Sequence, residues 1–416
     1  MVFPPKTSLL SSRGVCRLVH MPSRLPKFSF AGIYLIVFYV ATALSLFRWP
    51  IVAYDSDLWY HLASGRYFFT HGRLPDTSFF SFITPARPWI DYFWLFQLLV
   101  YGIHSLVGYQ GLIILRGLIF LLTASMILVF LVQAARSMGR VISWQAVLAF
   151  LMVYWFFLLP RYLLVRPHIF TYLLIVLFLY ILEYRRELSW CLPILAVLWC
   201  NLHGISFPIL VIICAAYFIE LVVGLRQSTA EPVRSHRQLL LPIALSIAAI
   251  WFTPHGAKLV MLPFTTTAFA SRYVGELRPI PLANILDIQI SHFTPTQTSL
   301  FAFILLAAWV SVFRSALGRR LRLSHTLLLL AGTALLSKGN RFTYEAALLF
   351  LPMLSCEFVA VGPALSDVRL SRGRAIAGWV LVFTISTTLL YSMFRKPQKY
   401  PVSPQNLPLG VATFLD

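Results

Sequence analysis

Long hydrophobic runs separated by short polar segments dominate the chain. Runs of spanning length lie at 31–49, 111–134, 142–160, 167–184, 204–224, 238–253, 298–316, 323–339, 342–362 and 375–394. Each is close to the roughly 20 apolar residues with which a helix crosses the hydrocarbon core of a bilayer. Shorter apolar runs at 92–107 and 189–201 need a separate assignment. The pattern predicts an all-α polytopic membrane protein.

Basic residues supply that assignment, because Lys and Arg gather on the cytoplasmic side of membrane proteins. With 189–201 spanning and 92–107 in the membrane interface, the later basic segments share the side of the basic N-terminal tail, 1–29. These segments are 136–140, 185–186, 226–237, 314–322 and 369–374. We therefore expect about eleven transmembrane helices within residues 30–395. The tail would be cytoplasmic, and residues 396–416 a short outside tail.

Composition agrees with a membrane protein. Hydrophobic residues make up 59% of the chain and charged ones 12%, whereas soluble proteins carry about 25% charged residues. The 34 Lys and Arg exceed the 14 Asp and Glu, which in a soluble protein would indicate a nucleic-acid partner. Membrane orientation accounts for the excess here, so we expect membrane lipids and no nucleic acid as partners. The five cysteines show no metal-binding spacing.

The acids concentrate in two long loops that this arrangement leaves outside, 50–110 and 254–297. They are Asp55, Asp57, Asp76, Asp91, Glu276 and Asp287. The inside loops are short and basic, so chemistry is expected on the outside. The sequence predicts an integral protein of the bacterial inner (plasma) membrane with its active site facing the periplasm or exterior.

The first outside loop predicts a helix in the lipid headgroup region, starting near Asp57 and ended by Gly72. Asp57 and His61 lie one turn apart on one face of it. Asp55 and Asp57 suit a divalent cation, Mg or Mn, or one can take a proton from an acceptor hydroxyl. Either alone is equally well explained as a helix cap. We predict Asp57 as catalytic base, Asp55 as its support or a metal ligand, and His61 as its orienting group.

Cations at the outer ends of the spans form a second candidate group. Arg161, Arg166 and His168 lie between two spans, and Lys338 and Arg341 between two others. Arginine suits phosphate oxygens, so these side chains are candidates for holding a phosphate headgroup. The alternative is that they snorkel to the interface.

Three further polar residues are candidates for substrate binding. Asp91 lies in a second aromatic stretch of the first loop, and Asn201 and His203 at an outer turn. A helix-packing turn explains Asn201 and His203 equally well. Glu183, Glu220, Glu345 and Glu357 were assigned no role, and Arg116 lies inside a predicted span without an evident partner. These residues stay open at the level of sequence.

The order of these elements resembles the GT-C superfamily of membrane glycosyltransferases, which use lipid-linked sugars. The stretch Asp57-Leu-Trp-Tyr-His61 is similar to the Asp-Pro-Trp-Phe-Asn stretch of oligosaccharyltransferase catalytic subunits. The motifs Arg166-Pro-His168, Asn201-Leu-His-Gly204 and Pro254-His-Gly256 resemble a group of largely uncharacterised bacterial membrane proteins placed with these enzymes. The resemblance extends over about 30 to 345. The common Asn-Pro-Tyr-Gly of that group is Thr253-Pro-His-Gly256 here.

The resemblance implies a GT-C-like helical domain and a glycosyltransferase that moves a hexosyl or pentosyl group from a polyprenyl-phosphate donor to an acceptor outside the membrane. The acceptor would be a lipid, a glycan or a protein. A transporter or flippase would instead show charges within broken helices and internal two-fold similarity, and neither is visible. A surface-polysaccharide polymerase or ligase usually has its large loop late in the chain, whereas the acidic loop here is early.

Overall fold

The computed structural model describes residues 30–51, 56–79, 87–140, 142, 144–226, 233–265, 275–279, 290–291, 294–295 and 297–366, and isolated positions after 366. The helices are α1 (Phe30–Arg48), α2 (Ser56–His71), α3 (Trp94–Val107), α4 (Tyr109–Ser137), α5 (Trp144–Tyr162), α6 (His168–Tyr184), α7 (Cys191–Leu202), α8 (Phe207–Arg226), α9 (Val233–Ala248), α10 (Gly256–Thr265), α13 (Gln297–Leu317), α14 (Leu323–Leu335), α15 (Thr343–Leu349) and α16 (Leu351–Ser366).

Short 3-10 turns and one small hairpin complete the described elements. The turns are η1 (Arg186–Leu188), η2 (Gly204–Ser206), η3 (Ala249–Phe252), η4 (Gly275–Leu277) and η5 (Asn340–Phe342). Strands β1 (Ile290–Ser291) and β2 (Thr294–Pro295) pair antiparallel, with Ile290 opposite Pro295. Helices therefore make up the architecture of the described residues.

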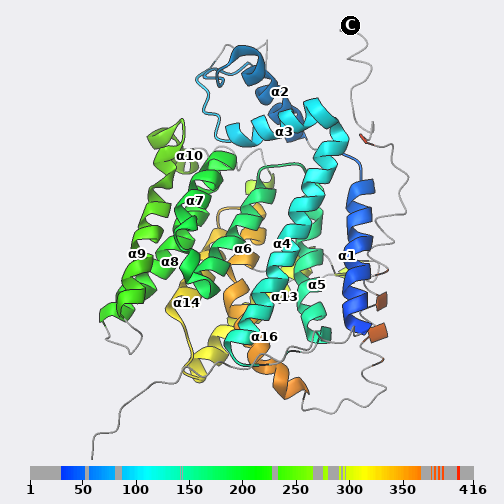
Figure 1. Cartoon of the computed structure of the whole chain (residues 1–416), viewed down its shortest axis with the longest axis vertical. Helices are drawn as coiled ribbons and strands as arrows, with labels where there is room; N and C mark the ends of the chain where they lie inside the picture. The colour runs from blue at the N-terminus through cyan, green and yellow to red at the C-terminus, as the bar shows by residue number, and fades with distance from the viewer. Residues whose placement is uncertain are drawn as a thin grey trace, which may run out of the picture.

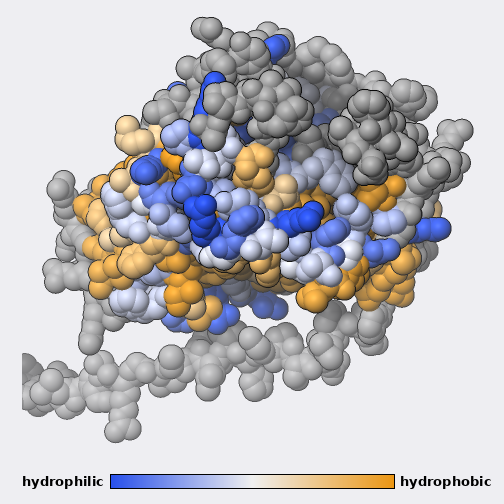
Figure 2. All heavy atoms as spheres, turned by 90° about the horizontal axis from the view of Figure 1, so that it is seen from above, coloured by the Kyte–Doolittle hydropathy of each residue, from blue (hydrophilic) through white to orange (hydrophobic). Residues whose placement is uncertain are grey.

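The long helices run side by side in a bundle, and α2 and α3 lie across one end of it (Figure 1). We call this the α2 end and the opposite one the far end. Viewed from the α2 end, hydrophilic side chains lie on the face and hydrophobic ones gather along its rim (Figure 2). This distribution fits a bundle surrounded by lipid and open to water at its end.

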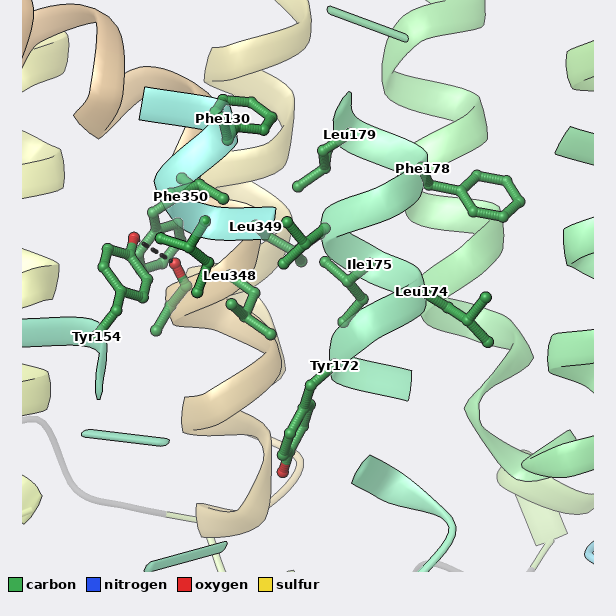
Figure 3. Packing of buried hydrophobic residues seen from close by; sticks show 14 of the residues in the cluster. Phe130, Tyr154, Tyr172, Leu174, Ile175, Phe178, Leu179, Leu348, Leu349 and Phe350 are labelled. Carbon is green, nitrogen blue, oxygen red and sulfur yellow. Dashed lines mark hydrogen bonds between the residues drawn. The ribbon is translucent and has the colours of Figure 1, made fainter. Parts of the chain in front are cut away.

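The core is continuous through the bundle. Leu174, Ile175 and Phe178 of α6 are buried; Ile175 points toward Leu348 and Leu349 of α15, whereas Leu174 and Phe178 point the other way (Figure 3). On the other side of α15, the hydroxyl of the buried Tyr154 donates to the carbonyl of Ala347 at 2.9 Å. Because α15 is packed on both sides, the residues beside it at the α2 end are held on a rigid element.

In the described part of the chain, fewer helices than predicted are long and apolar enough to cross a membrane. In the described part of the chain, α4, the segment Gly204–Gly224 and α13 are long and apolar enough to cross a membrane. Two bent helix pairs pass the same test together: Leu239–Phe252 with Gly256–Leu262, bent by 100°, and Asn340–Leu349 with Leu351–Val361, bent by 51°. The chain is thus an all-α membrane protein, and about eleven spans stays a prediction.

Two assignments differ in detail from the sequence prediction. The run 342–362 is not one straight helix, because the chain breaks between α15 and α16 at Phe350. Most of the run 375–394 lies outside the described residues. The 92–107 segment forms α3 and lies across the α2 end (Figure 1).

Arg116, which had no partner at the level of sequence, joins three helices. It is fully buried in α4. Its guanidinium donates to the carbonyls of Trp49 and Leu163, just beyond the ends of α1 and α5. Carbonyls at helix C-termini lack intrahelical donors and attract cations, so Arg116 satisfies groups that would otherwise be unpaired in the bundle.

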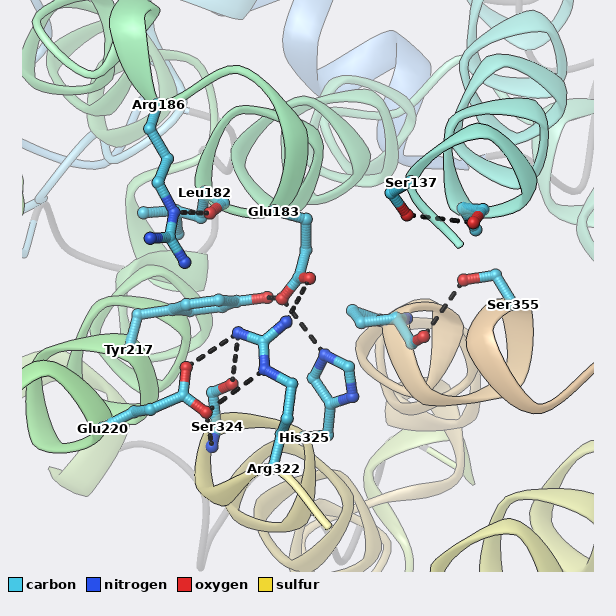
Figure 4. Close-up of polar contacts among 12 residues, drawn as sticks. Ser137, Leu182, Glu183, Arg186, Tyr217, Glu220, Arg322, Ser324, His325 and Ser355 are labelled. Atoms are coloured by element: carbon cyan, nitrogen blue, oxygen red, sulfur yellow. Dashed lines mark hydrogen bonds and ion pairs between the residues drawn. The ribbon is translucent and has the colours of Figure 1, made fainter. Parts of the chain in front are cut away.

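A closed ionic cluster lies at the far end, between α6, α8 and α14 (Figure 4). Arg322 contacts Glu183 at 2.6 Å and Glu220 at 2.8 Å. Glu183 also accepts from the Tyr217 hydroxyl at 2.6 Å and lies 3.1 Å from His325. We call these five side chains the far-end cluster. It accounts for Glu183 and Glu220, and it ties the start of α14 to two neighbouring helices.

Candidate functional site

Four charged side chains meet at the α2 end. Arg161, in the last turn of α5, donates two hydrogen bonds to the two carboxylate oxygens of Glu276, both at 3.0 Å. Arg166 contacts Asp57 at 3.0 Å and approaches Glu276 to 3.9 Å. We call these residues the α2-end cluster. It brings together parts of the chain more than 200 positions apart and includes both outside loops.

Local sequence explains why both arginines stand at this turn. Pro160 lies inside the last turn of α5, and Pro167 directly before α6. A proline disfavours helical backbone at the residue before it, so α5 does not continue through Arg166 into α6. The turn is closed by His168, whose Nε2 lies 3.0 Å from the carbonyl oxygen of Arg161. His168 therefore holds the turn that presents the arginines.

Burial differs between the partners. The side chains of Arg161 and Arg166 are 13% and 16% exposed, and those of Glu276 and Asp57 are 42% and 49% exposed. The cations are thus part of the bundle wall, and the carboxylates reach them from the water side. Burial alone would raise the pKa of Glu276, but the hydrogen bonds and charge of Arg161, with Arg166 and Arg341, hold it below its ordinary value.

A cavity of about 220 Å³ lies beside this cluster, between α5, α13 and α15. Arg161, Glu276, Arg341 and Tyr344 are among its lining residues. The Arg161 guanidinium lies 5.8 Å from the centre of the Tyr344 ring. Arg341 stacks on Phe342 at 4.9 Å and, within the described residues, forms no ion pair with a carboxylate. The cavity therefore holds one neutralised and one unneutralised arginine.

Two acids here were missed or unassigned as site residues from the sequence. The sequence indicates Glu276 only as an acid of the loop 254–297. The basic residues of the same loop were the available signal that this acid lies near cations. Glu345 lies on α15 next to the cavity residue Tyr344; it is buried, and its Oε2 has no hydrogen-bond partner among the described residues. Nothing in the apolar run around Glu345 indicates this placement.

The predicted role of His61 requires correction. Its ring is 2% exposed and packs edge-on against Phe93 at 5.2 Å and Phe96 at 4.9 Å. No hydrogen bond joins it to Asp57 in the described part of the chain. The fourth residue after Asp57 faces α3, not the cluster, because the aromatic rings of α3 cover that side of α2. Burial and then the charge of Arg166 lower the pKa of His61 to about 3, so the ring is neutral.

Asn201 and His203 also serve packing. Asn201 accepts from the Trp94 indole at 2.8 Å and donates to the carbonyl of Phe252 at 3.1 Å, so it joins α3, α7 and η3. His203 lies 2.7 Å from the Thr171 hydroxyl. A side chain at Gly204 would meet the Tyr92 carbonyl at 3.0 Å, which explains the glycine of this motif. The helix-packing alternative describes these residues better than the cavity alternative.

Asp91 lies under the site and is fully buried. Its carboxylate accepts from the backbone of Phe93 at 3.4 Å, and its own carbonyl lies 3.1 Å from His255 of the Thr253-Pro-His-Gly256 loop. Burial raises its pKa to about 6, partly offset by the Phe93 amide, Gln97 and Tyr60. Asp91 joins the two outside loops and does not line the cavity.

Three remaining predictions concern Lys338, Asp55 and a metal. Lys338 is exposed beyond the end of α14 and does not line the cavity. Asp55 lies outside the described residues. Within the described residues no group of three His, Cys, Asp or Glu side chains is placed to hold a metal ion. Asp57 already has a cationic neighbour in Arg166, so a cation site would depend on Asp55 and stays a prediction.

Comparison with known proteins gives a match among solved structures. No family model matches the sequence, and no curated protein matches it either. Among solved structures, the chain is similar to the oligosaccharyltransferase of Archaeoglobus fulgidus in its apo form, with a TM-score of 0.53 and 12% sequence identity. The alignment covers 94% of this chain and 60% of that one. The chain spans about three fifths of that protein's length.

This match shows that the chain shares a fold with that protein. It agrees with the helical membrane architecture predicted from the hydrophobic runs and with the fold implied by the loop motifs. At 12% identity the shared feature is the fold, and function has to be argued from the site.

Proposed function

We propose that this protein is a glycosyltransferase that moves a sugar from a polyprenyl-phosphate donor to an acceptor hydroxyl at the α2 end. The proposal rests on the cavity that Arg161 and Arg341 line, next to the Asp57–Arg166 pair. Arg341 has no carboxylate partner among the described residues. Arginines in a partly dry wall suit a phosphate. A carboxylate at the edge of the same site suits proton removal.

Asp57 is the proposed general base. It lies in the first turn of α2, about half exposed, with one oxygen 3.0 Å from Arg166. Arg166 orients the carboxylate, which accepts the proton of the acceptor hydroxyl. The acceptor oxygen attacks the anomeric carbon of the sugar, its proton passes to Asp57, and the bond from that carbon to the phosphate oxygen breaks. The electron pair of that bond leaves with the polyprenyl phosphate.

The arginines of the cavity stabilise the leaving group. Negative charge grows on the phosphate as the bond breaks, and fixed cations in a low-dielectric site lower the energy of that charge. Arg341 can bind the phosphate without giving up an ion pair with any described carboxylate. Arg161 holds Glu276 in a two-pronged contact of the kind that it would make with phosphate. Glu276 therefore competes with an anion for Arg161.

The position of the cavity supports a lipid-linked donor. The cavity is at the end of a membrane bundle, between helices whose outer faces are apolar: Phe303 of α13 is 58% exposed and Val310 of the same helix 55%. A donor with a polyprenyl chain can lie along such a face while its phosphate reaches the arginines. The bacterial inner membrane, the periplasmic side and the sugar type remain part of this proposal.

A transfer assay tests the function. Purified protein in lipid would be given a total polyprenyl-phosphate sugar extract with radiolabelled sugar, and transfer to endogenous lipid, glycan and protein fractions would be measured. Wild type should transfer label, and Asp57→Asn should be slower by about 10²–10⁴-fold, the cost of losing a general base. Asparagine keeps the size of Asp57 and caps helices well, so the variant should fold.

A matched control separates base chemistry from surface charge. Asp76→Asn removes an exposed carboxylate of the same loop, which pairs with Arg73 at 3.3 Å and lies outside the α2-end cluster. It should transfer at the wild-type rate. Equal transfer by wild type and Asp57→Asn would exclude Asp57 as the base, and no transfer of any lipid-linked label by wild type would exclude the function.

A further inference from the structure

A second concave surface lies on the outer side of α2, away from the proposed catalytic site. It has a volume of about 810 Å³ and is lined by α2, α3 and the start of α4. Arg66, His71 and His104 supply its basic side chains, and Trp59 and Tyr109 are among its aromatic ones. Its described lining residues include no carboxylate. We call this surface the α2–α3 groove.

Helix geometry separates this groove from Asp57. Nine residues from Asp57 to Arg66 turn an α-helix by a net angle of about 180° and advance it by about 13 Å. Arg66 therefore projects from the face of α2 opposite to the face that meets Arg166. An acceptor or donor bound to Asp57 does not occupy the groove, so its ligand has to be a different molecule.

The walls of the groove are rigid aromatic stacks. On one side, Tyr67 is stacked between His71, with ring centres 4.2 Å apart, and Phe79, at 4.7 Å. On the other side, Tyr109 packs against His104 at 4.5 Å and Trp59 at 5.9 Å. Both walls present polar edges on an aromatic body, the kind of surface that is enriched at the level of lipid headgroups.

Close packing of α2 on α3 fixes the distance between these walls. A side chain at Gly65 would meet the carbonyl oxygen of Gln97 and the Cβ of Tyr101, both at 2.5 Å. The glycine lets the helices approach at that point, while Arg66 and Tyr101 open outward into the groove. The groove is therefore formed by the fold of this hairpin and not by loosely placed surface chains.

Charge selects an anion as the ligand. Arg66 is exposed and, within the described residues, has no ion-pair partner. The Nδ1 atom of His71 contacts the Tyr67 carbonyl and the Thr70 hydroxyl, which leaves Nε2 facing outward without a described hydrogen bond. The nearest acid of the loop, Asp76, is 69% exposed and is paired with Arg73. No neighbouring carboxylate neutralises the groove in the described part of the chain.

The surroundings of the groove select a lipid as the source of that anion. At the corner between α3 and α4, next to His104 and Tyr109, Leu106 is 86% exposed and Val107 56%. Leu106 and Val107 give acyl chains an apolar surface next to the basic groove.

We infer that the α2–α3 groove binds the phosphate headgroup of an anionic phospholipid. Arg66 and His71 contact the phosphate, the aromatic walls flank the glycerol region, and the acyl chains descend along the apolar corner of α3 and α4. Because the ligand bridges α2, α3 and α4, it stabilises the hairpin that carries Asp57. The inference requires a membrane protein and holds whether or not the proposed transferase activity is found.

Lipid-dependent stability tests the inference. The full chain would be placed in nanodiscs of phosphatidylcholine alone or with added phosphatidylglycerol, and its apparent melting temperature and its retained lipid, by native mass spectrometry, would be measured. Wild type should gain stability and keep a phosphatidylglycerol molecule. The double variant Arg66→Gln, His71→Gln should bind that lipid about tenfold more weakly, a loss of about 1.4 kcal/mol.

Two matched variants serve as controls. Arg73→Gln removes an exposed arginine of the adjacent loop that does not line the groove, and it should behave as wild type. Arg66→Lys with His71 intact should recover most of the lipid effect, because it keeps the charge while losing the planar contact. Both controls confirm that the double variant reports the groove and not general surface charge.

Three results would overturn the inference. One is equal retention of phosphatidylglycerol by wild type and the double variant. Another is the same stabilisation by phosphatidylcholine alone, because binding in the groove would then not depend on the charge of the lipid. The third is full stabilisation by soluble glycerol phosphate without lipid, which would identify a site for a free anion. Each of these leaves the transfer assay with Asp57→Asn unaffected, so the two proposals fail separately.

Discussion

The two ionic clusters of the bundle have opposite patterns of burial. In the far-end cluster the acid is buried and the cation is more open: Glu183 is 3% exposed, Glu220 22% and Arg322 35%. In the α2-end cluster the cations are buried and the acids are open, with Arg161 at 13% and Glu276 at 42%. The same residue types are thus arranged in reverse at the two ends.

We use this reversal to separate a structural cluster from the proposed binding site. At the far end, each Glu183 oxygen has protein partners, and Arg322 reaches both acids. No described side chain there is left for a ligand. At the α2 end, exposed carboxylates cover buried arginines, and Arg341 remains unpaired beside a cavity among the described residues. Buried cations under removable anions are what an anion-binding site requires.

The largest expected effect comes from breaking the far-end cluster. Arg322→Gln leaves the buried Glu183 and the half-buried Glu220 without their cation, and removing one partner of a buried pair costs about 3–5 kcal/mol. We expect a large fall in apparent melting temperature and in the yield of folded protein. The folded fraction should transfer sugar at the wild-type rate per molecule. A variant as stable as wild type would contradict the structural role of this cluster.

The corresponding change at the α2 end should affect chemistry and leave stability nearly intact. Arg341→Gln removes a cation that makes no described ion pair, so the melting temperature should hardly move. Loss of one group that stabilises developing negative charge costs about 10²–10³-fold in rate, or about 2.7–4 kcal/mol. The transfer assay with saturating donor measures it. Lys338→Gln, outside the cavity, is the control, and equal losses from both changes would refute the assignment.

A third change tests Asp91, a buried carboxyl that belongs to neither cluster and has no ion-pair partner among the described residues. The pKa of Asp91 is raised to about 6, above about 3.9 for an unfolded Asp. The folded state therefore binds the proton more tightly, and the contribution of this group to stability falls as pH rises from about 4 to about 6, then stays constant. Asp91→Asn should raise stability at pH 8 by about 3 kcal/mol and leave it unchanged near pH 4.

Melting curves of wild type and Asp91→Asn across this pH range provide the measurement. Asp76→Asn, at an exposed carboxyl, should show no such difference at any pH. If Asp91→Asn destabilises the protein equally at both pH values, the carboxyl acts through hydrogen-bond geometry, and its charge is not what limits stability.

The sequence predicts which charged residues lie at the site better than it predicts which of them form pairs. Hydrophobic runs identified the helices, and the choice of Arg161, Arg166 and Arg341 followed from cations at span ends. It could not predict that Glu276 would neutralise Arg161, because 115 positions separate them and only the fold brings them together. Periodicity placed His61 on the side of Asp57, but the ring contacts of α3 decide which way that side chain points.

Two of the motifs that carry the resemblance contribute packing residues. Asn201 and His203 join helices, and His168 closes a turn. A motif read from sequence does not distinguish a residue that touches a ligand from one that positions another, since both depend on the same fold. For Arg116 and Glu183, hydropathy gives no role because their partners come from other parts of the chain, which only the fold brings together.

The smallest expected effect comes from removing the carboxylate that covers Arg161, and it tests directly whether the two clusters differ in function. If Glu276 covers Arg161 as a removable anion, Glu276→Gln should tighten the binding of a polyprenyl phosphate by about tenfold, which equals about 1.4 kcal/mol, because the phosphate no longer competes with a carboxylate. The equivalent change at the far end, Glu220→Gln, should not affect this affinity, because Arg322 keeps its contact with Glu183. Binding of farnesyl phosphate, measured by its effect on the melting temperature across a concentration series, gives both values. An unchanged or weaker affinity in Glu276→Gln would mean that Glu276 holds Arg161 in place for the ligand, as Glu183 holds Arg322, and the two clusters would then share one structural role.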